Sequence, residues 1–222
     1  MVLLALESTY LYEHLHETVQ GSVAERITQQ FFHHPWHGLR FWDLVQPGFM
    51  FIAGTAMAYS LHKQAAMGMS WQASFRKTLK RCFWLFFWGV LNYAVRDKGL
   101  SFELWNVLTQ LSFTTLVAFL IHRWKPAYQL LVCAGLLILT EILYRFTGIP
   151  GFDQPFTDQH NFGNYMDLVL MHKINADGWV AINCIPTAVH TIGGLLAGKV
   201  LIEQKSPLRP LVAWGIASLL VG

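Results

Sequence analysis

Long apolar runs separated by short polar segments dominate the sequence. Six of these runs have the length or the apolar character of membrane helices: residues 41–61, 82–95, 104–121, 127–144, 180–202 and 210–221. Because an α-helix rises about 1.5 Å per residue, the first of them matches a hydrocarbon core that is about 30 Å thick. Residues 1–12 form a shorter apolar run, which we interpret as half of another helix. The pattern predicts an all-α fold, a polytopic bundle of about six to seven transmembrane helices.

The composition agrees with an outer surface that faces lipid. Hydrophobic residues make up 54% of the 222 residues and charged residues only 13%, whereas an average soluble domain carries about 25% charged residues. So few charges cannot cover a soluble globule, and so many aromatic residues exclude intrinsic disorder. We expect a single membrane-embedded domain over residues 1–222. Because apolar runs are cut short at both ends of the sequence, we also expect this domain to be incomplete at both ends.

The basic residues predict the orientation in the membrane. Ten of the 16 Lys and Arg residues fall in short segments on one side: Lys63, Arg76, Lys77, Lys80, Arg81, Arg123, Lys125, Lys199, Lys205 and Arg209. Short loops rich in Lys and Arg stay in the cytoplasm, so this side is the cytoplasmic face. The long connections, residues 13–40 and 146–179, lie on the outer face, where we expect substrate contacts. A net charge of +3 without a long basic run predicts no nucleic-acid partner.

The densest polar chemistry lies just before the first long apolar run. Three histidines, His33, His34 and His37, surround Trp36. They have three interpretations: a zinc site, which the nearby proline and glycine disfavour; an interfacial loop with belt aromatics; or a general base, since imidazole exchanges protons near neutral pH. Asp43 either stabilises the start of the next helix or orients a histidine. No metal is expected, and the three isolated cysteines predict neither a zinc site nor a disulfide framework.

Polar residues also occur inside the later runs. Asn106, Gln110 and Thr114 are spaced by four and share one face of a helix. Such a stripe either joins helices or lines a cavity. Asn183 and His190 lie in a later run, and an ionisable group within a span is expected to face the protein interior or water.

Two stretches resemble one known family. Residues 33–54 read HHPWHGLRFWDLVQPGFMFIAG. This is similar to the hallmark of the heparan-α-glucosaminide N-acetyltransferase family, a His, two residues and W-x-G-L, followed by D-L-V-x-P-x-F-x-F-I-x-G. Residues 183–198 resemble the family's later helix with I-P-[ST] and G-x-L-A-G, and residues 107–110 match its V-L-Q segment more weakly. The resemblance runs over the whole chain and is closest to bacterial members that lack a lysosomal amino-terminal domain.

The resemblance implies an integral-membrane acyltransferase that moves an acetyl group from cytoplasmic acetyl-CoA to an amine of a sugar across the membrane. It implies that His33 is the catalytic histidine, with His34 as its neighbour. It also implies that Asp43, Asn183 and His190 face a core cavity. The expected location is the bacterial inner membrane, and the expected partners are membrane lipid and a carbohydrate acceptor.

Two features depart from the family pattern, and both concern acetyl-CoA. The motif S-x-D-x-L-R-G, which usually precedes the first helix, is absent, and Leu111 follows Gln110 where a basic residue is expected. We nevertheless expect the CoA phosphates to meet cations at the cytoplasmic face. The candidates are Arg76, Lys77, Lys80 and Arg81.

The chemistry of acetyl transfer assigns a hypothetical role to each candidate. The reaction requires a nucleophile, a base and stabilisation of an oxyanion. His33 would take a proton from the amine or carry the acetyl group transiently, and Asp43 would orient it. The amide of Gln110 or Asn183 would donate to the oxyanion. The residues expected to line the substrate cavity are Trp36, Asn106, Gln110, Asn183 and His190.

Two rival interpretations remain open. A sugar or amino-sugar transporter would use the same polar stripe and glycine-containing helices as a pathway, although no inverted repeat is visible. A purely structural membrane protein would show no dependence of activity on His33. Gly194 and Gly198 are spaced for close helix packing, which also allows a homodimer.

Overall fold

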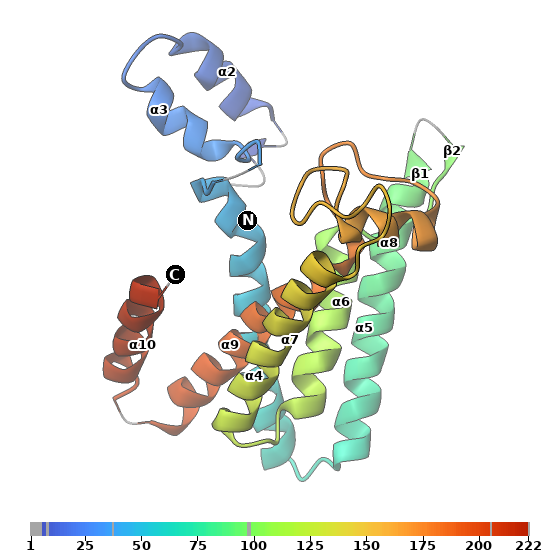
Figure 1. Cartoon of the computed structure of the whole chain (residues 1–222). Coiled ribbons are helices and arrows are strands. Elements are labelled where there is room, and N and C mark those ends of the chain that lie inside the picture. Colours follow the sequence, from blue (N-terminus) through green and yellow to red (C-terminus); the bar gives the residue numbers. More distant parts are fainter. Residues whose placement is uncertain (1–5, 8, 37, 97–98, 205, 222) are drawn as a thin grey trace. The chain divides into compact units, whose positions relative to one another are not determined.

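The computed structural model describes residues 6–7, 9–36, 38–96, 99–204 and 206–221 (Figure 1). The chain divides into two compact units, Met1–Gly48 and Phe49–Gly222.

Short helices surround a small aromatic core in the first unit. Its elements are α2 (Leu11–Thr18), α3 (Glu25–Thr28) and two 3-10 turns, η1 (Gln29–Phe31) and η2 (Phe41–Leu44). The Tyr12 ring stacks on Phe31 with centroids 4.7 Å apart and meets Trp42 edge-on at 5.4 Å. Tyr12 and Trp42 are only 6% and 5% exposed. These rings therefore join α2 to both 3-10 turns, and η2 carries one residue of the candidate site.

The apolar run 1–12 does not continue as one helix. Tyr10 has a φ of 57°, in the left-handed region, and a turn at residues 9–10 precedes α2. An L-residue in that conformation ends a regular right-handed helix. The expectation of half a spanning helix is therefore wrong for the described part of this run, and residues 1–5 and 8 lie outside the described residues.

Long helices form the second unit. They begin with α4 (Val45–Ala66), whose residues from Phe49 onward belong to this unit. The elements that follow are α5 (Trp71–Ala94), β1 (Val95–Arg96), β2 (Gly99–Leu100), α6 (Val107–Ile121), α7 (Pro126–Phe146), α8 (Phe162–Met171), η3 (Ala181–Asn183), α9 (Cys184–Glu203) and α10 (Leu208–Val221). β1 and β2 form a short antiparallel pair. Among these helices, α6 contacts both α5 and α9, and α9 also contacts α7.

Several helices are suited to crossing a membrane. Phe41–Ala66, Pro126–Phe146 and Ala181–Glu203 are long and apolar enough to do so, and Val107–Ile121 and Leu208–Leu220 are shorter apolar helices. The expected all-α transmembrane bundle is confirmed. α5 is longer than the expected run 82–95 because its first half carries basic residues that an apolar pattern does not include.

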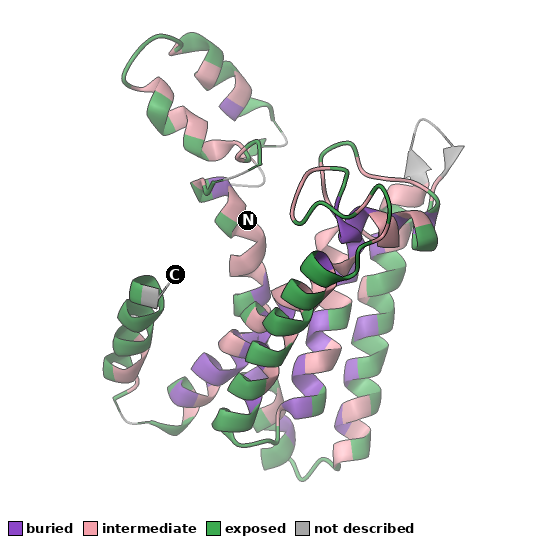
Figure 2. Cartoon of the chain, viewed as in Figure 1, coloured by how far each residue is buried: buried purple, intermediate pink, exposed green. Residues whose placement is uncertain are grey.

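The core of the second unit lies where α4, α6, α7 and α9 meet. Phe119, Ile192 and Leu195 are fully buried there, and Cys133 of α7 joins the same cluster. The outward faces of α5 and α7 are instead exposed over most of their length (Figure 2). Leu131 on α7 is 64% exposed. Apolar surface of this extent is what a lipid-facing helix presents.

Glycines bring α4 and α9 into close contact. A Cβ atom at Gly194 would lie 1.9 Å from the carbonyl oxygen of Phe51, and one at Gly54 would lie 2.0 Å from that of Thr191. The approach also allows Thr55 Oγ1 to donate to the Gly194 carbonyl at 3.0 Å. The predicted close-packing face of α9 is thus occupied by α4 of the same chain, and the homodimer stays a prediction.

Polar side chains join α5 to α6. Asn106 Oδ1 accepts from the Thr109 amide at 3.0 Å and caps α6, while Asn106 Nδ2 donates to the Gly89 carbonyl of α5 at 3.1 Å. About two helical turns further on, Ser112 Oγ donates to the Cys82 carbonyl at 2.8 Å. Because Asn106 is the N-cap, α6 begins at Val107 and not at residue 104, where the apolar run begins.

Candidate active site

The first unit pairs the predicted histidine with the predicted carboxylate. His33 follows η1, Asp43 lies in η2, and His33 Nδ1 is 2.8 Å from Asp43 Oδ1. The other carboxylate oxygen accepts from the Arg40 amide at 2.8 Å. Asp43 therefore stabilises the start of η2 and contacts the imidazole at the same time, so the two roles considered for it are not alternatives.

The pair fixes which nitrogen of His33 is basic. An ionised carboxylate only accepts hydrogen bonds, so Nδ1 carries the proton and the imidazole lone pair lies on Nε2. The Arg40 guanidinium holds the adjoining backbone by donating to the His33 carbonyl at 2.9 Å. The imidazole is half-exposed, whereas the Asp43 side chain is 22% exposed. This is the arrangement of a base with a carboxylate that orients it.

His34 lies beside the pair but in a different environment. Its ring packs over Gly38, where a Cβ atom would lie 2.4 Å from His34 Nε2. His34 Nδ1 is buried, and no described residue makes a hydrogen bond to it. The His34 amide donates to Asp43 at 3.4 Å. Trp36 is 37% exposed, and His37 lies outside the described residues.

A second group of candidates surrounds a cavity in the second unit. The cavity has a volume of about 320 Å³ and lies among α5, α6, α8 and the start of α9. Its lining includes Phe86, Thr109, Gln110, Phe113, Ile182 and Cys184. Gln110 is 1% exposed, and its Nε2 donates to the Trp105 carbonyl at 3.3 Å.

The rest of the polar stripe on α6 joins helices. Asn106 caps α6 and bonds α5, and it does not belong to the cavity lining. Thr114 accepts from Thr191 Oγ1 of α9 at 3.0 Å, with both side chains fully buried. Both roles considered for the stripe therefore occur: Asn106 and Thr114 join helices, and Gln110 lines the cavity.

Asn183 and His190, the two candidates within residues 183–198, lie in different surroundings. Asn183 is the final residue of η3, between two residues that line the cavity. His190 is exposed on the second unit, and its Nδ1 lies 3.3 Å from the Thr187 carbonyl of its own helix. Among the residues that the structure describes, no three His, Cys, Asp or Glu side chains lie close enough to share a metal ion.

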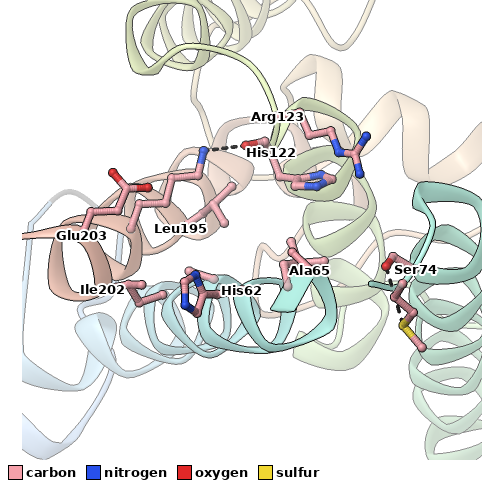
Figure 3. Close-up of a pocket in the computed structure, with 12 residues that line it drawn as sticks. His62, Ala65, Ser74, His122, Arg123, Leu195, Ile202 and Glu203 are labelled. Atoms are coloured by element: carbon pink, nitrogen blue, oxygen red, sulfur yellow. Dashed lines mark hydrogen bonds between the residues drawn. The ribbon is translucent and has the colours of Figure 1, made fainter. Parts of the chain in front are cut away.

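A second cavity lies where the C-terminal ends of α4, α6 and α9 converge (Figure 3). It has a volume of about 240 Å³, and its polar lining consists of His62, Ser74, His122, Arg123, Lys199 and Glu203. Lys199 Nζ donates to the His122 carbonyl at 2.5 Å. Burial lowers the pKa of His122, a hydrogen bond with the Phe119 carbonyl opposes this, and the nearby Arg123 and Lys199 charges lower it further.

The cations predicted for CoA are not the ones that line this cavity. Arg76, Lys77, Lys80 and Arg81 are exposed on α5 and do not belong to its lining. Arg123 and Lys199 are recognisable in the sequence as basic residues of the same face. Nothing in the sequence shows that they share a cavity, because they belong to different loops and helices.

Sequence reasoning missed Asp167, the fully buried carboxylate of α8. Its Oδ2 accepts from Trp105 Nε1 at 2.8 Å, and its Oδ1 accepts from the Ala181 amide at 2.9 Å. Burial raises the pKa of this carboxyl to about 6, and the two hydrogen bonds oppose the rise. The available signal was an acid in the middle of an apolar helix, which is costly unless paired or functional.

The chain matches the family model described as heparan-alpha-glucosaminide N-acetyltransferase, catalytic, over residues 15–219. The chain belongs to this family. A search of curated proteins returned no match. Family membership makes the protein a membrane acyltransferase and confirms the expectation of an enzyme. The matched region contains the His33–Asp43 pair and both cavities described above.

Proposed function

We propose that the protein transfers an acetyl group from acetyl-CoA at the cytoplasmic face to the amine of an amino sugar at the outer face of a bacterial inner membrane. The observation that carries this proposal is the 2.8 Å contact between His33 Nδ1 and Asp43 Oδ1. It directs the basic lone pair of His33 to Nε2, as a general base requires.

The reaction begins with the sugar amine. His33 Nε2 removes a proton from the ammonium, and the resulting amine attacks the thioester carbonyl of acetyl-CoA. A tetrahedral oxyanion forms, its C–S bond breaks, and the departing CoA thiolate takes the second amine proton and leaves as the thiol. Alternatively, His33 Nε2 attacks the thioester first and expels the CoA thiolate; the free amine then attacks the acetyl group, its proton goes to the thiolate, and the bond from the acetyl carbon to Nε2 breaks. The same Asp43 contact stabilises the imidazolium in that route.

The cavity at the ends of α4, α6 and α9 suits the phosphates of the donor. Arg123 and Lys199 both line it, and a guanidinium and an ammonium are the usual partners of phosphate oxygens. Arg76, Lys77, Lys80 and Arg81 stay candidates for a weaker, solvent-screened contribution. The amides of Gln110 and Asn183 stay candidates for oxyanion donors.

The first experiment measures CoA release and N-acetylation of glucosamine by the purified protein in liposomes. His33→Ala is compared with His14→Ala, a matched control on exposed α2 whose side chain is 75% exposed. We expect His33→Ala to lose about 100-fold or more in kcat, as for removal of a general base, and His14→Ala to keep the wild-type rate.

The outcomes separate the alternatives. Equal rates in both variants would eliminate His33 as the base but keep the enzyme. No CoA release from a folded protein, together with uptake of labelled glucosamine into the liposomes, would replace the proposal by a transporter.

A further inference from the structure

Asp167 connects the two chain segments that carry the candidate amides of the second unit. One segment contains Trp105, whose indole N–H donates to Oδ2 at 2.8 Å. The other contains Ala181, whose amide donates to Oδ1 at 2.9 Å. Each carboxylate oxygen is thus committed to a different segment, and the two donors are far apart in the sequence.

Each of these segments leads directly to a candidate amide. The Trp105 carbonyl accepts from Gln110 Nε2 at 3.3 Å. Ala181 begins η3, the single turn that ends at Asn183. Both segments also line the 320 Å³ cavity, Leu104 and Gln110 from one side and Ala181 and Ile182 from the other. The Asp167 carboxylate therefore sets the distance between the two sides of the cavity.

The cost of burying this acid indicates a specific role. Asp167 is fully buried, and a buried carboxylate is unfavourable unless its hydrogen bonds are satisfied. Packing alone would be served by an apolar residue at this position, as it is at the buried Phe162 and Met171 of the same helix. A partly buried pair nearby, Lys173 with Glu103 at 2.9 Å, already joins the end of α8 to the segment that contains Trp105.

We infer that Asp167 is a positioning residue that holds Gln110 and the η3 turn, which ends at Asn183, at a fixed separation across this cavity. The catalytic part of the inference rests on the proposed acetyl transfer. The structural part does not depend on activity, because the cavity contains a cysteine whose reactivity can be measured directly. Cys184 lines the cavity and is partly exposed, whereas Cys82 and Cys133 are buried.

The test compares Asp167→Asn, Trp105→Phe and the control Asp177→Asn, an exposed acid of the following loop. Asn presents a carbonyl oxygen to one donor and an NH2 group to the other, and Phe removes the indole N–H together with part of the ring that Lys173 Nζ approaches at 5.4 Å. Alkylation of Cys184 by N-ethylmaleimide is followed by mass spectrometry on the full chain in detergent. We expect the rate to rise about tenfold in Asp167→Asn, consistent with loss of a hydrogen bond to a charged group, less in Trp105→Phe, and not at all in Asp177→Asn.

Kinetics on the same variants test the catalytic part. We expect kcat for acetyl transfer to fall about tenfold or more in Asp167→Asn, with KM for acetyl-CoA within about twofold, because the donor phosphates bind elsewhere. An unchanged Cys184 rate in both Asp167→Asn and Trp105→Phe overturns the inference whatever the activity. A raised Cys184 rate with unchanged kcat overturns the catalytic part. Absence of turnover in the wild type overturns the proposed function, while the Cys184 rates still decide the structural part.

Discussion

Gly194 gives the sharpest test of how α4 and α9 pack. Its hypothetical Cβ atom would meet the carbonyl oxygen, carbonyl carbon and Cα of Phe51 at 1.9, 2.7 and 3.0 Å. All three are backbone atoms, so no side chain can rotate away to make room. The adjacent Gly193 offers a matched control in the same helix, because its nearest neighbours are the ring carbons of Phe51 at 3.8 and 3.9 Å.

The structure sets the size of the effect. To accept a methyl group at Gly194, the two helices must separate by about 1 Å, and overpacking of this kind costs about 1–3 kcal/mol. The separation also stretches the bond from Thr55 Oγ1 to the Gly194 carbonyl, now 3.0 Å, which is worth about 1 kcal/mol. Both substitutions gain about the same helix propensity, up to about 1 kcal/mol. The difference between Gly194→Ala and Gly193→Ala should therefore be about 2–4 kcal/mol.

Equilibrium unfolding in mixed detergent–SDS micelles, followed by circular dichroism, measures this difference. We expect Gly193→Ala to unfold at the wild-type SDS fraction or above it, and Gly194→Ala clearly below. Equal midpoints for the two variants would refute the close approach of α4 and α9 and the reasoning built on it.

Three further predictions concern the candidate sites. Asp43→Asn should keep the cap on η2 but lower kcat by about 100-fold or more, because an amide can donate to His33 Nδ1 and reverse the tautomer; steady-state kinetics with a wild-type rate would contradict this. Gly38→Ala should lower the free energy of unfolding by about 1–3 kcal/mol, because its methyl group meets the His34 ring and because its φ of 155° is one that an L-residue rarely adopts; thermal melts should show that a His34→Ala background relieves the first part of this loss and keeps the second, and an equal loss in both backgrounds would contradict the contact. Asp167 has a pKa raised to about 6, so the folded protein binds its proton more tightly than the unfolded chain does; stability should fall by about 2–3 kcal/mol as the pH rises from about 4 to about 6 and then level off. Asp167→Asn should lack this fall in unfolding experiments across that pH range, and an identical profile would show that the carboxyl is not buried as described.

The sequence predicts well what depends on one stretch of chain at a time. Runs of apolar residues have the length of spans, and α7 begins and ends within two residues of the run 127–144. His33 and Asp43 are ten residues apart, and their proximity follows from a short connection between two 3-10 turns. The family motif falls on the same segment, so this pair could be predicted together.

What the sequence does not predict depends on contacts between distant segments. The hydrogen bond from Trp105 to Asp167 spans 62 residues, and no periodicity indicates it. The cations that line the cavity at the C-terminal ends of α4, α6 and α9 also come from segments that are distant in the sequence. Arg76 and Lys77 are exposed on α5 and stay a prediction for phosphate binding, whereas Lys199 of α9 lines the cavity, which its place in the sequence does not indicate.

The hydrogen bonds between α5 and α6 have a consequence for biosynthesis. α5 is not among the helices apolar enough to span a membrane, and α6 has only 15 residues, or about 23 Å at about 1.5 Å per residue. The polar side chains that would be costly in lipid if α6 entered alone, Asn106 and Ser112, donate to the Gly89 and Cys82 carbonyls of α5. Satisfying those groups before contact with hydrocarbon favours entry as a preformed hairpin. The insertion machinery would then receive α5 and α6 as one unit, and a ribosome stalled between them would leave α5 at the membrane surface.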